Sequence, residues 1–295
     1  MPAPRRLAVA AALALAAPVL AAPVPGVTVY AAGDIARCAH PDPRFSGAAD
    51  TAALVGGELA ADPGAAVLTL GDHTYPRGTA AEFANCYGPT WGRFKDRTWP
   101  APGNHEYSTA SAAPYFAYFG ARAGRGHYSF ELGNWHLVSL DSDLRPREHA
   151  AQLAWLRDDL ARHPARCTLA YWHHPLYSSG GNGSIAKMRD VWELLYRAGA
   201  EIVLSGHDHD YERFAPQDAD GRLDAARGIR QFVVGTGGAY PTPFLGMAPN
   251  SEVRDASSFG VLRLRLLDGG YEWEFLPVGE LPPGARADRG SGSCH

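Results

Sequence analysis

Short apolar runs that end at a polar corner recur along the chain. Residues 26–32 and 65–70 are two such runs, and each stops at a Gly-Asp pair. Between them, residues 48–61 have a helical composition and end at the breaker sequence Asp-Pro-Gly. A strand, a helix and a strand in this order form a βαβ unit, whose strands run parallel. The pattern therefore predicts an α/β fold around a buried parallel sheet.

The rest of the chain continues this alternation. Residues 147–163 place leucines on one face of a predicted helix, and Ser184 is expected to cap another helix that ends at Gly199. The segment 107–126 is rich in Tyr and Phe and is expected to cover the core. Strands are predicted at residues 127–132, 135–140, 167–172, 201–204, 230–234, 260–267 and 270–276.

The first residues are typical of a secretory signal peptide, predicted to comprise residues 1–21. Arg5 and Arg6 precede an apolar run over residues 7–20, and small residues lead to a cleavage site expected after Ala21. The apolar run is shorter than the roughly 20 residues that a membrane span needs. We therefore expect a secreted or periplasmic protein with no membrane span after cleavage.

Composition and charge narrow the choice of partners. The 295 residues are 46% hydrophobic and 20% charged, as in ordinary globular proteins. No linker-like break interrupts the middle, so residues 26–280 are predicted to form one domain, followed by a polar tail over 281–295. The net charge is −4 without a basic stripe, so no nucleic-acid polymer is expected as a partner.

The four cysteines predict disulfides, because an exported chain meets an oxidising compartment. No two cysteines have the CxxC spacing of a zinc-thiolate site. Three pairings are possible. Cys38 and Cys86 each follow a strand that ends in Gly-Asp, which favours their pairing and leaves Cys167 with Cys294.

The predicted strand ends share one property, which is that each delivers side chains able to bind metals. They are Asp34, Asp72 with Tyr75, Asn104 with His105, His173, and His207 with His209. Carboxylate, phenolate, amide and imidazole groups are ligands of divalent and trivalent metals. The carboxyl ends of parallel strands meet at one edge of a sheet. These groups are too many for one ion and suit two ions that share a bridging carboxylate.

Five short motifs in sequence order resemble those of the calcineurin-like metallophosphoesterases. They are GDIA (33–36), GDHTY (71–75), GNHE (103–106), HHPLY (173–177) and GHDHDYER (206–213). Tyr75 after Asp72, and the YER sequence after His209, resemble more narrowly the purple acid phosphatase branch. The resemblance implies a four-layer α/β/β/α sandwich of two mixed β-sheets flanked by helices.

The resemblance also implies a role for each motif residue. One metal, Fe(III) in the best-known relatives, would be held by Asp34, Asp72, Tyr75 and His209. The second metal, Fe(II), Zn(II) or Mn(II), would be held by Asp72, Asn104, His173 and His207. Asp72 would bridge the two ions, and His105 would protonate the leaving group.

Such a centre implies hydrolysis of phosphomonoesters. Two cations roughly 3.5–4 Å apart lower the pKa of a bound water from about 15.7 towards 7 and stabilise charge on both sides of an in-line displacement. The resulting hydroxide would attack phosphorus, and a histidine with an ordinary pKa near 6.5 can protonate the departing alkoxide. The expected partner is therefore a small phosphate ester.

Two other functions stay open at this point. A phosphodiesterase, including one that acts on cyclic nucleotides, uses the same two-metal core. A non-catalytic metal-binding relative would be expected to lose ligands first, and this chain has lost none.

The chain departs from the family pattern at some positions. Ala36 replaces the second glycine of the first motif, and residues 178–187 lack the histidines that contact the substrate phosphate in plant-type members. His174 is a candidate substrate contact, although a place beside the ligands is favoured. His73 is expected to face outward.

Overall fold

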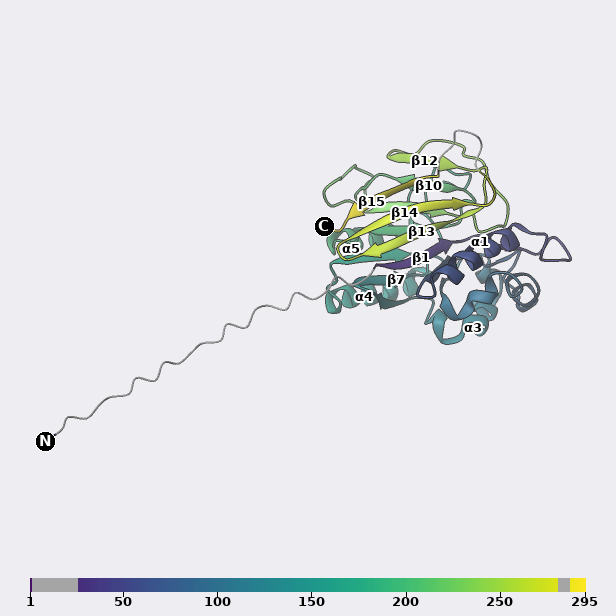
Figure 1. Ribbon diagram of the computed structural model, residues 1–295, viewed down its shortest axis with the longest axis horizontal. Helices are drawn as coiled ribbons and strands as arrows, with labels where there is room; N and C mark the ends of the chain where they lie inside the picture. Colours follow the sequence, from purple (N-terminus) through teal and green to yellow (C-terminus); the bar gives the residue numbers. More distant parts are fainter. Residues whose placement is uncertain (2–25, 281–286) are drawn as a thin grey trace.

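The computed structural model describes residues 1, 26–280 and 287–295, so the predicted signal peptide and part of the predicted tail lie outside the described residues. Two mixed β-sheets form the centre of the molecule, one with six strands and one with seven. Helices lie on their outer faces (Figure 1). The predicted α/β fold with two mixed sheets is confirmed.

The first sheet combines parallel and antiparallel pairs. Its strands, in order across the sheet, are β15 (Arg289–Ser293), β14 (Gly270–Pro277), β13 (Gly260–Leu267), β1 (Val27–Ala32), β3 (Ala66–Leu70) and β5 (Thr98–Ala101). β1, β3 and β5 run parallel, whereas β13 joins β1 antiparallel. The βαβ unit predicted at the start of the chain is β1, α1 and β3.

The second sheet has the same mixed character. Its strands, in order across the sheet, are β12 (Ser251–Asp255), β10 (Tyr211–Phe214), β11 (Arg230–Val234), β9 (Ile202–Ser205), β8 (Cys167–Tyr171), β7 (Trp135–Ser139) and β6 (Tyr128–Leu132). β7, β8, β9 and β11 run parallel to one another. A separate two-stranded ribbon consists of β2 (Ala36–Arg37) and β4 (Thr74–Tyr75).

Two of the predicted helices, over residues 48–61 and 147–163, are found within one residue of their predicted bounds. The α-helices are α1 (Gly47–Ala61), α2 (Ala80–Glu82), α3 (Ala113–Phe119), α4 (Pro146–Arg162) and α5 (Arg189–Arg197). Shorter helical turns are η1 (Phe83–Tyr87), η2 (Trp91–Arg97), η3 (Glu106–Ser108), η4 (Ala110–Ala112), η5 (Gly120–Ala123) and η6 (Ala186–Met188). No helix among the described residues is long and apolar enough to cross a membrane.

Successive residues of the second sheet face two different cores, as expected when side chains alternate along a strand. Leu137 and Leu169 pack in a core shared with the first sheet. Val138 and Ala170 point the other way and pack in a core with Trp192 of α5. The second sheet therefore lies between the first sheet and the helices α4 and α5, which gives the layered sandwich.

Two predictions about element boundaries need correction. Ser184 does not cap a helix, because its hydroxyl accepts a hydrogen bond from the backbone N–H of Ser178, and η6 begins only at Ala186. Part of the predicted polar tail is β15, which pairs with β14 at the edge of the first sheet.

Both predicted disulfides are present. They join Cys38 to Cys86 and Cys167 to Cys294. The first fixes the chain just after β2 to η1, and the second fixes the C-terminal residues to the start of β8.

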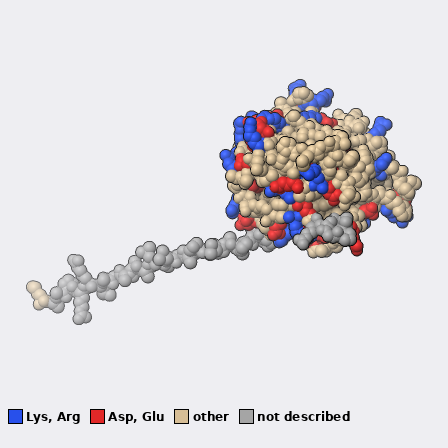
Figure 2. Space-filling model, turned by 90° about the horizontal axis from the view of Figure 1, so that it is seen from above, with Lys and Arg blue, Asp and Glu red and all other residues tan. Residues whose placement is uncertain are grey.

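The surface agrees with the mixed charge of the sequence. Figure 2 shows basic and acidic side chains side by side on the face seen from above, around a broad area without charge.

Candidate metal centre

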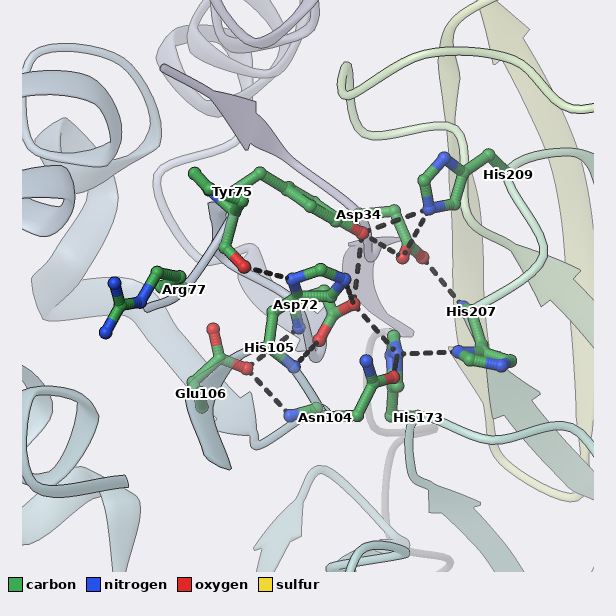
Figure 3. A network of polar contacts seen from close by, with 12 residues as sticks. Asp34, Asp72, Tyr75, Arg77, Asn104, His105, Glu106, His173, His207 and His209 are labelled. Carbon is green, nitrogen blue, oxygen red and sulfur yellow. Dashed lines mark hydrogen bonds and ion pairs between the residues drawn. The ribbon is translucent and has the colours of Figure 1, made fainter. Parts of the chain in front are cut away.

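The predicted ligands converge at the carboxyl ends of strands from both sheets (Figure 3). Each ligand loop follows one strand. The pairs are β1 with Asp34, β3 with Asp72, β5 with Asn104, β8 with His173, and β9 with His207 and His209. Tyr75 lies in β4 of the small ribbon. The two sheets therefore supply opposite walls of one site.

The backbone turns sharply where it presents several of these ligands. Asp34, Asp72 and His207 have φ angles of 59°, 49° and 72°, in the left-handed region that residues with a Cβ rarely adopt. Gly71 has a φ of 87°, and a Cβ built there would lie 2.7 Å from His173 Nδ1. Such strained backbone is concentrated at functional sites, where the surrounding structure holds it in place.

One group of ligand atoms surrounds the hydroxyl of Tyr75. This hydroxyl donates a hydrogen bond of 2.6 Å to Asp34 Oδ1 and lies 3.1 Å from Asp72 Oδ2 and 3.0 Å from His209 Nε2. His209 Nε2 is also 3.2 Å from Asp34 Oδ1. These four side chains are the set predicted for the first metal.

A second group surrounds Nε2 of His173. This nitrogen lies 3.2 Å from Asp72 Oδ2, 3.1 Å from Asn104 Oδ1 and 3.3 Å from His207 Nδ1. Asp72 Oδ2 therefore belongs to both groups, as a bridging carboxylate must. Ligand atoms about 3 Å apart are consistent with metal–ligand distances of roughly 2.0–2.3 Å.

The electrostatics of the site favour positive charge. Asp34, Asp72 and His173 are buried. Burial, together with Asp34 and Asp72, raises the pKa of Tyr75 well above its usual value of 10.0. Burial alone would lower the pKa of His173, but the same two carboxylates raise it to about 10. The two carboxylates thus favour positive charge on the neighbouring side chains, and a metal cation would supply such charge. A bound cation would also lower the pKa of the Tyr75 phenol that coordinates it.

Backbone carbonyls orient two of the imidazole rings. His173 Nδ1 lies 2.8 Å from Leu70 O, and His209 Nδ1 lies 2.8 Å from Tyr240 O. A carbonyl only accepts, so each Nδ1 carries a proton, and each Nε2 is the ring nitrogen that faces the other ligands. This is the arrangement by which outer partners fix metal-binding histidines.

Glu106 is a functional residue to which the sequence analysis gave no role. Its buried carboxylate accepts hydrogen bonds from the backbone N–H groups of Asp72 (2.9 Å), His73 (2.9 Å) and Gly103 (2.8 Å). It thereby joins the loops after β3 and β5, which carry Asp72 and Asn104. The sequence contained a sign of this role, because Glu106 is the last residue of the GNHE motif.

His105 lies at the accessible side of the centre. Its Nδ1 is 2.5 Å from Pro76 O, and its Nε2 is 3.7 Å from Asp72 Oδ2. The side chain is 29% exposed, and its ring centroid lies 4.4 Å from that of Tyr75. Nε2 therefore faces the metal ligands from the solvent side.

Two further histidines occupy buried positions. The prediction that His73 faces outward is wrong, since it is fully buried and its Nε2 lies 2.7 Å from Thr69 Oγ1. Its ring packs among the rings of Phe83, Tyr115 and Phe119, which come from distant parts of the chain. His174 is also buried, with Nδ1 2.9 Å from Ser142 Oγ and its ring 4.4 Å from that of His207. Its role as a substrate contact stays a prediction.

Comparison with known proteins identifies the family. Residues 27–211 match the family model described as calcineurin-like phosphoesterase. This chain belongs to that family. The matched part of this calcineurin-like phosphoesterase runs from β1 into β10 and contains every predicted metal ligand.

Curated relatives support the narrower resemblance. Purple acid phosphatase 21 of Arabidopsis thaliana is 32% identical over 219 residues, which cover 63% of this chain and 49% of the relative. Acid phosphatase type 7 of Homo sapiens is 28% identical over 205 residues, covering 57% and 46%. The chain thus spans about half the length of the curated relatives it matches.

Solved structures share the fold. The purple acid phosphatase PPD1 of Lupinus luteus has a TM-score of 0.71 at 20% identity, covering 91% of this chain and 54% of the other. GAP50 of Plasmodium, described as the anchor in the inner membrane complex, has a TM-score of 0.66 at 13% identity, covering 92% and 89%. Because the same fold serves an anchor, activity has to be argued from the side chains.

Proposed function

We propose that this chain is an exported phosphatase with a binuclear metal centre that hydrolyses phosphomonoesters. The observation that carries the proposal is the double role of Asp72 Oδ2, which lies within 3.2 Å of both Tyr75 Oη and His173 Nε2. One carboxylate oxygen shared by two complete ligand groups suits two cations rather than one. The relatives named as acid phosphatases support the same reading.

The proposed ligands divide between the two ions as the geometry groups them. The first ion, proposed as Fe(III), would be held by Asp34, Asp72, Tyr75 and His209. The second, proposed as Fe(II), Zn(II) or Mn(II), would be held by Asp72, Asn104, His173 and His207. When bound, the pair of cations would supply an activated water and neutralise charge on the phosphoryl oxygens.

His105 is proposed as the group that protonates the leaving oxygen. Its Nδ1 proton is held by the carbonyl of Pro76, so that Nε2 is the nitrogen that gains and loses a proton. Nε2 lies on the exposed side of the ligands, where a departing alcohol would reach solvent. The hydrogen bond to Pro76 holds the ring in one orientation, which lowers the entropic cost of placing the acid beside the leaving oxygen.

Hydrolysis of an aryl phosphate tests the function directly. Purified protein loaded with iron, zinc or manganese is assayed from about pH 4 to pH 9, the range around the titration of histidine. We expect turnover of p-nitrophenyl phosphate to exceed that of bis(p-nitrophenyl) phosphate. The reverse order would favour a phosphodiesterase, and no turnover of either ester would refute the proposal.

Two variants separate metal binding from catalysis. Asp72→Asn is expected to lose both metals, because it removes the shared ligand. His105→Ala is expected to keep the metal content but to lower kcat by roughly 10²–10⁴-fold, the usual contribution of a positioned acid. The control is His149→Ala on α4, where the ring pairs with Asp190. Equal loss of metal and activity in His105→Ala would make that residue structural.

Export and metal identity have their own tests. Disulfides form in an oxidising compartment, so the two disulfides support export. N-terminal sequencing is expected to show that the mature protein begins at the residue after Ala21. Elemental analysis with a visible absorption spectrum identifies the metals. An iron–tyrosinate centre is expected to be coloured through Tyr75, and a colourless, fully active protein would exclude Fe(III) at that position.

A further inference from the structure

A cavity opens beside His105, next to the proposed metal centre. Its volume is about 520 Å³, within the range of small-molecule sites. It is lined by Arg37, Cys38, Ala39, Tyr75, Pro76, His105 and Tyr240. The proposed acid His105 and the proposed ligand Tyr75 both border this space. If His105 protonates the leaving oxygen, the rest of the leaving group lies in this cavity.

The charge of the cavity wall is one-sided. Arg37 is the cationic residue of the lining, and the lining contains no carboxylate. No carboxylate among the described residues lies within 4.0 Å of the Arg37 guanidinium, although ion pairs occupy many other arginines of the chain. The planar N–H groups of an unpaired guanidinium are suited to a phosphate or carboxylate.

Neighbouring residues hold Arg37 at the cavity. In the small ribbon, Arg37 of β2 is in register with Tyr75 of β4, so the two residues project on the same side. The guanidinium carbon lies 5.2 Å from the ring centroid of Tyr240, a cation–π distance. Tyr240 in turn packs against His209 with ring centroids 4.4 Å apart. Arg37 is thereby linked through one aromatic ring to a metal ligand.

We propose that this cavity binds a second phosphate group carried by the leaving group, with Arg37 as its anion-binding residue and Tyr240 as the platform that positions it. The inference rests on the proposed phosphatase function. The preferred substrates are then phosphate esters or anhydrides that bear two phosphates. In the reaction, the oxygen of a water bonds to the outer phosphorus and the water releases one proton to solvent. The bond to the leaving oxygen breaks, that oxygen takes a proton from His105, and His105 regains a proton from solvent.

The test compares two substrates, AMP and ADP. Hydrolysis of AMP releases neutral adenosine as the leaving group. Hydrolysis of the terminal phosphate of ADP releases AMP, a leaving group that carries a second phosphate. Arg37→Ala is expected to lower kcat/KM for ADP about tenfold, the lower end of 1.5–3 kcal/mol for a charged hydrogen bond at an exposed site. The value for AMP is expected to change less than threefold. Arg37→Lys is expected to restore part of the ADP activity, since it keeps the charge but not the planar fork.

The matched control is Arg77→Ala. Arg77 is exposed, does not line the cavity, and directs its side chain away from the ligands in Figure 3. It is expected to leave both substrates unaffected. An equal effect of Arg37→Ala on AMP and ADP, or the same effect in Arg77→Ala, would overturn the proposal.

A binding measurement keeps the test independent of turnover. Methylenediphosphonate carries two phosphonates and is not hydrolysed, and orthophosphate carries one group. Calorimetry of the metal-loaded protein is expected to show a preference for methylenediphosphonate that falls about tenfold in Arg37→Ala. A preference that does not change would refute the anion site. Inactive wild-type protein that still shows this preference would refute the phosphatase function alone.

Discussion

Replacing Glu106 by Gln tests whether a buried carboxylate holds the metal-binding loops in place. Glu106 Oε2 accepts from the N–H groups of Asp72 and Gly103, and Oε1 accepts from that of His73. A glutamine has almost the same shape but only one accepting oxygen. Whichever way its amide is turned, an NH₂ group faces at least one backbone N–H that then loses its acceptor at this buried position.

The magnitude follows from those three bonds. A hydrogen bond to a charged group contributes about 1.5–3 kcal/mol, and leaving a buried donor unsatisfied costs roughly 1–3 kcal/mol. We expect Glu106→Gln to lower the free energy of unfolding of the metal-free protein by about 2–3 kcal/mol. Because the loops carrying Asp72 and Asn104 lose their common anchor, metal affinity is expected to fall about 10–100-fold.

Two assays measure these effects separately. Urea unfolding of the metal-stripped protein gives the stability change, and competition with a chelator gives the metal affinity. The control is Glu193→Gln on α5, a half-exposed side chain that pairs with Arg197; surface changes of this kind usually stay within about 0.5 kcal/mol. Wild-type stability together with wild-type metal affinity in Glu106→Gln would refute the anchoring role.

Two further predictions concern stability away from the centre. Replacing Cys38 and Cys86 by Ser removes a cross-link with a sequence separation of 48. From the chain-entropy relation, urea unfolding is expected to show a decrease of about 4 kcal/mol in the free energy of unfolding. A decrease below about 1 kcal/mol would contradict this prediction. His136 lies 2.9 Å from Asp159 and 2.7 Å from Glu131, and these carboxylates raise its pKa above 6.5 although burial lowers it. The stability gained over His136→Gln is therefore expected to be greatest below pH 6.5 and to shrink as pH rises through the folded-state pKa; unfolding at several pH values checks this, and a gain that grows with pH would contradict it.

The convergence of the proposed ligands could be predicted from the sequence because strand ends and short motifs carry these residues. Asp34 and Asp72 each follow an apolar run that forms a parallel strand, and parallel strands bring their carboxyl ends together. Local sequence is enough to say where such a strand stops. The resemblance then assigned the histidines of the second sheet, whose distance from Asp72 no local pattern gives.

The remaining features depend on contacts between distant segments. Tyr240 belongs to no motif, yet its carbonyl orients His209 and its ring packs on Arg37. These contacts exist only because the chain after β11 returns to the ribbon. His73 was misplaced for the same reason, since its burial depends on a cluster of aromatic rings contributed by η1 and α3.

The strained backbone at the centre is held by hydrogen bonds between protein groups. Asp34, Asp72 and His207 all have positive φ, and each such residue costs of order 1–3 kcal/mol. Protein contacts hold these conformations: the N–H of His207 donates to Asp34 Oδ2 at 2.8 Å, and that of Asp72 donates to Glu106. Since these hydrogen bonds involve no ion, the strain is supported by the protein itself.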